Sequence, residues 1–499
     1  MFFQTTEFQL LSTQMFDEDG FCCLGLFFNT SDFIVLQLMN TTGKQIFSET
    51  FYQGEHYRSV PLAEYRQTPQ SGVYTLNVFD KKNTLIFKNE MSFFQRNVTI
   101  THIEDYWWQH DTTYALVGFN ITFFNPGDFP LYPSKGTVTI HEKSTSSLLL
   151  PAVLEPMQTT QSSWFVFVDV LPYQNLQIDL ALFTNDDQQL IHTTINRIPS
   201  NFVQDIAYSW YYEGNFEIHI PNIPFLSLYY HTKDRIILED YAVYVFDPYD
   251  DPYISLVTKQ LQSLQKTIGE IDTINYIASF VQHLRYAEDD PHDITVEYPR
   301  FPIEMLFDKQ GDCEDKAILT AALLDSLGFS VALLRLPNHM AVGVQTMQPL
   351  ESQSYYVENY YYLETTRSRW TLGRIPEEYQ KLTDITLYPI SNRPILLHQW
   401  KNATHITEGK TKEYVVLCIY IVNYGRTTAD QVVLQAGFVD NRSIMYNPRS
   451  IALYKVVPYL IQQTKLIIDV PHEVSTVLKT RLFFNDTMVH EKESTSRFS

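Results

Sequence analysis

Residues 311–328 read GDCEDKAILTAALLDSLG, and this stretch predicts a turn followed by a buried helix. Asp312 is a typical N-cap residue, and the Asp315 carboxylate can reach back to the backbone N–H of the cap. The helix is apolar almost all round and ends at Gly328. Cys313 then occupies the first helical position, where unpaired N–H groups and the helix dipole favour a thiolate. The stretch therefore predicts an activated nucleophile.

Two predicted strands farther along the chain carry partners for this thiol. Residues 339–344 read HMAVGV and begin with His339, whereas residues 360–366 read YYYLETT and contain Glu364. If these strands pair antiparallel, the imidazole and the carboxylate can face each other on the side of the sheet that the helix covers. We therefore expect Cys313 to be the nucleophile, His339 the general base and Glu364 the group that orients the imidazole.

Each of these residues also has an ordinary structural interpretation. A cysteine on an apolar helix is usually a small core residue, and a histidine or glutamate on a strand usually has no chemical role. Cys313, however, precedes the apolar run and lies between acidic residues. The three residues also follow one another at spacings of about 25 residues, which fits one compact site. The pattern favours catalysis over three unrelated structural residues.

The three segments together resemble the transglutaminase-like cysteine peptidase superfamily. They are most similar to a prokaryotic branch with the pattern GDCED, HMAVG and YYxET, and the resemblance covers about residues 205–395. It implies a catalytic triad in which Cys313 is the nucleophile, His339 the base and Glu364 the third member. The wider superfamily usually has Asp at the third position, so Glu364 departs from its pattern by one methylene. No oxyanion donor is assigned beyond the backbone N–H groups near Cys313.

Two classes of function are consistent with these motifs. The first is a cysteine hydrolase that cleaves amide or peptide bonds through a thioester acyl-enzyme, or a transamidase that passes the acyl group to an amine. The sequence does not separate these reactions, because acceptor access and pocket shape decide between them. The second is a non-catalytic binding or adhesive protein that uses the central domain as a scaffold.

The composition of the chain indicates which classes of binding partner to expect. The chain has 499 residues, a formal net charge of −21 and a pI near 5.0. Since no basic face could neutralise phosphates, we do not expect nucleic acid as a partner. The four cysteines form no CxxC or Cys/His cluster, so we expect free thiols, no metal and no cofactor. The acidic residues Asp289, Asp290, Asp293 and Glu297 match no calcium-binding loop and favour a solvated loop.

The chain length predicts several domains. Strand-like runs separated by turn residues predict β-sandwiches at 1–96 and 97–200, and an Ig-like or fibronectin-like sandwich at 396–499. Residues 201–395 contain the motifs, and apolar positions at helical spacing from Val257 to Leu284 predict two helices that meet near Gly269. The expected fold is a central α+β transglutaminase-like or papain-like domain flanked by all-β sandwich domains.

Seven Asn-x-Ser/Thr sequences bear on localisation, and they lie at Asn29, Asn40, Asn97, Asn120, Asn402, Asn441 and Asn485. Chance would give about three or four, so the excess favours an extracellular or cell-surface protein, with coincidence and a cytoplasmic location as the alternative. The sequence contains no run of eighteen or more apolar residues, so it predicts no transmembrane helix. The expected partners are a protein or peptide substrate and, through the β modules, a cell-surface polymer or protein.

Overall fold

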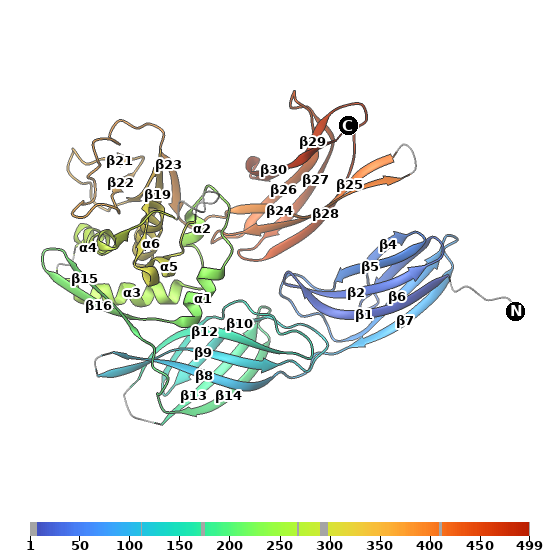
Figure 1. The fold of residues 1–499 in the computed structure, drawn as a ribbon, viewed down its shortest axis with the longest axis horizontal. Helices are drawn as coiled ribbons and strands as arrows, with labels where there is room; N and C mark the ends of the chain where they lie inside the picture. Colours follow the sequence, from blue (N-terminus) through green and yellow to red (C-terminus); the bar gives the residue numbers. More distant parts are fainter. Residues whose placement is uncertain are drawn as a thin grey trace. The chain divides into compact units, whose positions relative to one another are not determined.

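The computed structural model describes residues 7–110, 112–170, 175–266, 269–289, 298–408 and 412–498 (Figure 1). It is mostly β, with many separate sheets. The chain divides into two compact units, Met1–Asp205 and Ile206–Ser499.

The first part of the first unit is built from antiparallel strands. These strands are β1 (Phe8–Glu18), β2 (Phe21–Thr30), β3 (Ile34–Met39), β4 (Gln45–Phe51), β5 (Gly54–Pro61), β6 (Gly72–Asp80) and β7 (Leu85–Phe93). They form one sheet in the order β1-β2-β5 and another in the order β4-β3-β6-β7. Alternate residues of β3 are buried (Ile34, Leu36 and Leu38), and they share one apolar core with residues of β2 and β6.

The second part of this unit repeats the arrangement with two further sheets. Its strands are β8 (Thr99–His110), β9 (Thr113–Phe124), β10 (Pro133–Ile140), β11 (Lys143–Leu148), β12 (Thr159–Val170), β13 (Leu176–Thr184) and β14 (Gln189–Arg197). The sheet orders are β12-β9-β8 and β11-β10-β13-β14. At the end of β9, buried Asn125 donates to the carbonyls of Phe129 and Leu154, each at 2.7 Å, and accepts from the N–H of Gly127. The side chain thereby closes the turn.

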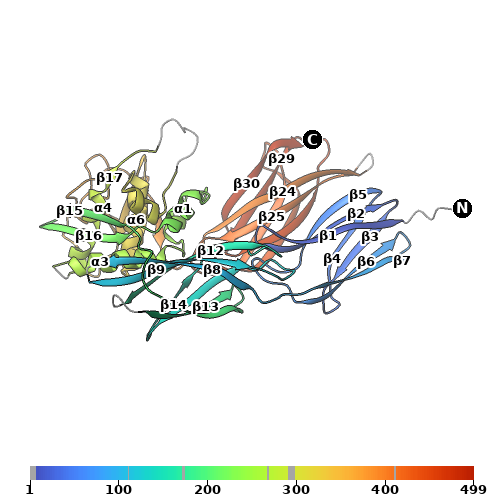
Figure 2. The same ribbon diagram turned by 60° about the horizontal axis from the view of Figure 1, so that its bottom comes forward.

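The second unit contains the helices of the structure. Its first elements are β15 (Asp205–Tyr211), β16 (Asn215–Pro221), α1 (Pro224–Thr232), α2 (Ala242–Val245), α3 (Asp251–Leu264), α4 (Glu270–His283), β17 (Arg285–Tyr286), α5 (Pro302–Asp308), β18 (Gln310–Gly311) and α6 (Cys313–Ser326). β15 and β16 form a two-stranded ribbon beside α3 (Figure 2). α6 contacts α2, α3, α4 and α5, which explains why it is buried on all sides.

A five-stranded sheet follows α6 and covers it. Its strands are β19 (Val331–Leu336), β20 (His339–Val344), β21 (Tyr356–Val357), β22 (Tyr360–Leu363) and β23 (Thr386–Ile390), in the order β21-β22-β20-β19-β23. β20 and β22 pair antiparallel, as predicted. α6 contacts both β19 and β20. The strand that begins with His339 therefore lies directly over the helix that begins with Cys313.

The last part of the second unit is again all β. Its strands are β24 (Leu396–Glu408), β25 (Lys412–Asn423), β26 (Ala429–Val439), β27 (Met445–Val456), β28 (Ile461–Asp469), β29 (Thr476–Phe484) and β30 (Thr487–Phe498), in sheets β24-β25-β28 and β27-β26-β29-β30. Buried Asn423 closes a turn as Asn125 does, donating to the carbonyls of Thr427 and Val456 and accepting from Gly425.

Several local predictions can be compared with these elements. α3 and α4 flank Gly269, the N-cap of α4, as predicted. Two further helices, α1 and α5, begin with a proline, which has no N–H to lose at the first helical position. Among the described residues, no helix has both the length and the apolar character needed to cross a membrane.

Candidate active site

Cys313 is the first residue of α6, at the end of a constrained turn. Both halves of the predicted capping box are present, and the Asp312 N–H donates to Asp315 Oδ2 at 3.3 Å. A Cβ on Gly311 would lie 2.5 Å from Asp315 Oδ2 and 2.6 Å from Met305 Sδ, so any other residue here would displace both side chains. The turn and the cap together fix where the sulfur lies.

The surroundings of the Cys313 sulfur differ from the sequence-based expectation. The thiol donates to Glu314 Oε2 at 3.2 Å, and the backbone N–H of Met340 donates to the sulfur. Burial, followed by the carboxylate of Glu314, raises the pKa of the Cys313 thiol well above its usual value, and the Met340 N–H only partly opposes this. A helix dipole contributes about 0.3–1 kcal/mol, less than one pKa unit. The prediction of a resting thiolate is therefore wrong, because desolvation and the adjacent acid outweigh the dipole.

His339 is the first residue of β20, and one of its ring nitrogens is hydrogen-bonded to a carboxylate. Its Nε2 lies 3.2 Å from Glu364 Oε2, and its side chain is 8% exposed. An ionised carboxylate can only accept a hydrogen bond, so Nε2 must carry the proton. In the neutral ring, Nδ1 is then the nitrogen that can take a proton. Because Met340, the next residue, contacts the Cys313 sulfur, the structure brings the thiol and the imidazole strand together.

Glu364 follows the last residue of β22 and is completely buried. Its carboxylate accepts from the Tyr362 hydroxyl at 2.8 Å, from the Thr366 hydroxyl at 2.6 Å and from the N–H groups of Thr365 and Thr366. Burial alone would raise the pKa of Glu364, but the bonds from His339 and Thr366 outweigh burial and lower it to about 2. The strand was expected to continue to Thr366; it stops at Leu363 because the carboxylate binds the N–H groups that follow.

Gln282 and Lys316 support this arrangement and were not identified from the sequence. Gln282 Nε2 donates to the carbonyls of Glu364 and Trp370, both at 2.8 Å, and thereby ties α4 to the loop after β22. Lys316 Nζ donates to three carbonyls at the end of α4, of which that of Leu284 is nearest at 2.6 Å. Burial lowers the pKa of Lys316 to about 8. The one signal in the sequence is a lysine directly before the apolar run of α6.

Arg300 holds the start of α6 from the other side. Its N–H and its Nη1 donate to the two oxygens of Asp315, at 2.7 and 2.5 Å, and Nη1 also contacts Asp289 at 3.1 Å. Burial, together with the charge of Asp312, raises the pKa of Asp315 to about 7 although Arg300 opposes this rise. The Asp315 carboxylate therefore takes part both in the capping box of α6 and in an ion pair with Arg300.

Two tyrosines border the site. The ring of Tyr379 stacks on His339, with centroids 5.0 Å apart and planes 10° from parallel. Tyr286, 47% exposed, lies opposite Gly311 in the β17–β18 pair. Burial, and next the charge of Cys313, raises the pKa of Tyr286 to about 12. The imidazole therefore has an aromatic ring stacked on it, and a partly exposed tyrosine lies beside the turn that precedes the thiol.

The residues on either side of the thiol have a spacing that a metal ion could bridge. Ligand atoms of Asp312, Cys313 and Glu314 lie within 4.8 Å of one another, and no other such group occurs in the part of the chain that the structure describes. The absence of a metal stays a prediction. Of the acidic loop considered above, Asp289 binds Arg300, whereas Asp290, Asp293 and Glu297 lie outside the described residues.

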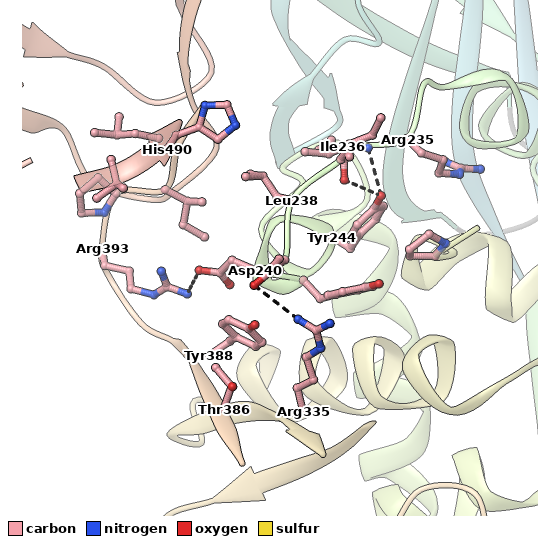
Figure 3. A pocket seen from close by; sticks show the side chains of 18 of the residues that line it. Arg235, Ile236, Leu238, Asp240, Tyr244, Arg335, Thr386, Tyr388, Arg393 and His490 are labelled. Atoms are coloured by element: carbon pink, nitrogen blue, oxygen red, sulfur yellow. Dashed lines mark hydrogen bonds and ion pairs between the residues drawn. The ribbon is translucent and has the colours of Figure 1, made fainter. Parts of the chain in front are cut away.

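The large cavity in Figure 3 has a volume of about 1130 Å³ and lies between the segment after α1, β23 and β30. Its walls carry the ion pair Arg393–Asp240 at 2.7 Å (Figure 3). A second ion pair joins Arg335 and Glu239 at 3.5 Å. None of the three candidate catalytic residues lines it. The cavity and the three candidate residues are therefore separate features of the second unit.

A family model described as "Transglutaminase-like domain" matches residues 254–370, a range that includes Cys313, His339 and Glu364. Residues 254–370 are a transglutaminase-like domain. The match begins within α3 and ends beyond Glu364, so the transglutaminase-like domain contains α4, α5, α6 and strands β19 to β22. The match concerns this part of the chain only.

Other comparisons add little to this assignment. No curated protein matches the chain. Among solved structures, the YadV chaperone is similar over 38% of this chain and 100% of its own, at 9% identity and a TM-score of 0.15. The exo-chitosanase CsxA of Amycolatopsis orientalis is similar over 95% of this chain and 76% of its own, at 7% identity and a TM-score of 0.17. A putative protease from Parabacteroides distasonis is similar over 73% of this chain and 94% of its own, at 9% identity and a TM-score of 0.18. TM-scores this low carry no argument about fold or function.

Proposed function

We propose that the transglutaminase-like domain is a cysteine hydrolase that cleaves amide or peptide bonds. The observation that carries the proposal is the hydrogen bond from His339 Nε2 to buried Glu364. Met340, which follows His339 in the same strand, contacts the Cys313 sulfur. This pairing leaves Nδ1 of a neutral imidazole as the base for the thiol. Thiol, base and orienting acid are the three parts that nucleophilic catalysis of acyl transfer requires.

The reaction follows from these protonation states. As the Cys313 sulfur attacks the carbonyl carbon, His339 Nδ1 accepts the thiol proton, and the carbonyl oxygen gains the negative charge. The imidazolium then donates this proton to the nitrogen of the leaving amine, the C–N bond breaks, and a thioester remains on Cys313. A water molecule, deprotonated by His339, attacks the thioester and releases a carboxylic acid and the free thiol.

Glu364 contributes by staying ionised throughout. A carboxylate with a pKa of about 2 keeps its charge at any pH at which the enzyme would work. It therefore fixes the imidazole tautomer and stabilises the positive charge that the ring gains in the first step. Its longer side chain, compared with the usual Asp, is accommodated because Thr365 and Thr366 bind the second oxygen.

Transfer of the acyl group to a primary amine is the alternative outcome of the same thioester. The amine replaces water in the second step, and the product is a new amide rather than an acid. The exposed flank at Tyr286 supports entry of an acceptor, and both products can be measured in one assay. The non-catalytic scaffold is the remaining alternative, supported by the large share of the chain in β-sheets outside the transglutaminase-like domain.

We also propose the modular context of this domain. The division into sandwiches at 1–96, 97–200 and 396–499 around an α+β domain at 201–395 is supported by the paired sheets in each range. An extracellular or cell-surface location is supported by five exposed asparagines in Asn-x-Ser/Thr sequences: Asn29, Asn97, Asn402, Asn441 and Asn485. In this setting the sandwiches would present the enzyme to a protein or polymer surface.

The decisive experiment compares the full chain with Cys313→Ala on a mixed peptide-amide substrate library and on casein, with and without a primary amine. We expect new carboxyl termini with the wild type and at least about a 10³-fold loss in the variant. Cys418→Ala, which changes a cysteine in β25 of the last sandwich, should keep full activity. Amine incorporation at the expense of hydrolysis would assign the transamidase instead. If neither product depends on Cys313, the domain is a scaffold.

A further inference from the structure

The segment that follows Glu364 folds back over the imidazole. Tyr379, fifteen residues beyond Glu364 in the chain, places its ring parallel to His339 at 5.0 Å between centroids. The His339 ring thus has one face covered and Nε2 bound to Glu364. Stacking restrains the tilt of the ring, whereas the hydrogen bond restrains only one of its nitrogens. The two contacts together define where Nδ1 points.

Tyr379 is itself held in place. It packs in a small apolar cluster with Tyr362, whose hydroxyl donates to Glu364. The neighbouring residue Glu378 forms an ion pair with Arg367 at 2.5 Å, and the Tyr379 N–H donates to the Pro376 carbonyl at 3.0 Å. The stack and the orienting acid therefore share one support, so that the ring and its carboxylate are positioned as a unit.

The position of Tyr379 also suits the charge that develops during the reaction. The face of a phenol ring is electron-rich and attracts a cation placed over it. The imidazole acquires positive charge when it takes the thiol proton. Burial, then Glu364 and more weakly Cys313, raises the pKa of the Tyr379 phenol, so the hydroxyl stays protonated and the ring neutral. A neutral aromatic face stabilises the imidazolium without competing for the proton.

We propose that Tyr379 is a positioning residue that holds the His339 imidazole between Glu364 and Cys313 and stabilises the imidazolium. Its effect on turnover rests on the proposed function, whereas the stack itself does not. Tyr379 acts through His339 and touches no reacting atom. Substrate binding should therefore depend on it little, and the chemical step should depend on it clearly.

The first test is kinetic and uses the full chain. Tyr379→Ala should lower kcat about tenfold and change KM less than about twofold, and Tyr379→Phe, which keeps the ring, should restore most of kcat. In Tyr379→Ala the acid limb of the kcat–pH profile should move to lower pH by about half a unit, because the imidazolium loses its aromatic partner. Tyr356→Ala is the matched control: Tyr356 is 61% exposed and packs edge-on against Tyr361 in the same sheet.

The second test needs no activity. In protein labelled with ¹³C-histidine, the His339 ring signal, assigned with His339→Gln, should move downfield in Tyr379→Ala and stay unchanged in Tyr379→Phe, because only a stacked ring shifts it upfield. Loss of the shift together with the kcat effect supports the proposal. An unchanged ring signal in Tyr379→Ala overturns it. A shifted signal in an enzyme with no Cys313-dependent activity keeps the stack and removes the proposed function instead. If Tyr379→Ala does not fold, Tyr379→Leu, which refills the cluster, takes its place in both tests.

Discussion

Two buried histidines in the second unit have opposite surroundings. His339 gives Nε2 to an ionised carboxylate that is held at low pKa by further donors. His398, in β24, is fully buried and bonded to the Thr480 hydroxyl at 2.7 Å and to His490 at 2.8 Å. Burial, and then the charge of His490, lowers the pKa of His398 to about 3.

The two histidines are both largely buried, and they differ in their partners. A ring beside a carboxylate has a partner that can balance the charge of an added proton. His398 has a hydroxyl and a second histidine as partners, so its burial is not offset by an acid, and it satisfies hydrogen bonds within a core. The second unit therefore contains one histidine that is paired with an acid and one that is not.

The largest expected effect separates the two histidines by activity. His339→Ala should lower kcat about 10³-fold, because it removes the imidazole that takes the thiol proton in the proposed mechanism, and should leave the midpoint of thermal unfolding nearly unchanged. His398→Ala should do the reverse: full activity, with a loss of about 2 kcal/mol in the free energy of unfolding from a cavity and from the lost hydrogen bonds to Thr480 and His490. Steady-state kinetics and urea unfolding of both variants test this. Equal activities would remove His339 from the mechanism.

A smaller loss of activity is expected at the orienting acid. Glu364→Gln should lower kcat about 10²-fold, less than His339→Ala, because the base remains but its tautomer and charge are no longer favoured. Glu364→Asp keeps the charge and shortens the reach by one methylene, so it should be the milder of the two. A loss larger than that of His339→Ala would contradict the roles assigned to the pair.

How far the sequence anticipated this site depends on how local the interactions are. The capped helix that begins at Cys313 and the pairing of β20 with β22 follow from patterns within a few residues. Gln282 and Lys316 donate hydrogen bonds to backbone carbonyls more than thirty residues away. Every residue has a backbone carbonyl, so the sequence does not indicate which one a side chain will bind. The thiolate expectation failed for a similar reason. Burial of Cys313 and the direction of the Glu314 side chain are properties of the folded chain alone.

The acid stability of the second unit should reflect the buried imidazole of His398. The folded pKa of His398, about 3, lies below its ordinary value of 6.5, so the unfolded chain binds the proton first. Its contribution to stability is therefore complete above pH 6.5 and is lost progressively as the pH falls toward 3. In His398→Gln the free energy of unfolding should fall less steeply over this range. A parallel pH dependence in both proteins would show that His398 is not responsible.

The smallest effect concerns the reactivity of the thiol. Glu314→Gln removes the charge that, after burial, contributes most to the raised pKa of Cys313. Alkylation of Cys313 by iodoacetamide at pH 7 should then become about threefold to tenfold faster. Glu351→Gln, an exposed change elsewhere in the domain, is the control. An unchanged rate would mean that burial alone holds the proton on the sulfur.

The buried ammonium of Lys316 offers a way to measure how often the transglutaminase-like domain opens. It is 1% exposed and spans the junction between α6 and the end of α4, so an amine-specific reagent reaches it only when these helices separate. The rate at which Lys316 is acylated would then measure local opening of the transglutaminase-like domain, independently of the other parts of the chain. Mass spectrometry of that single amine would follow the core without any added dye or tag.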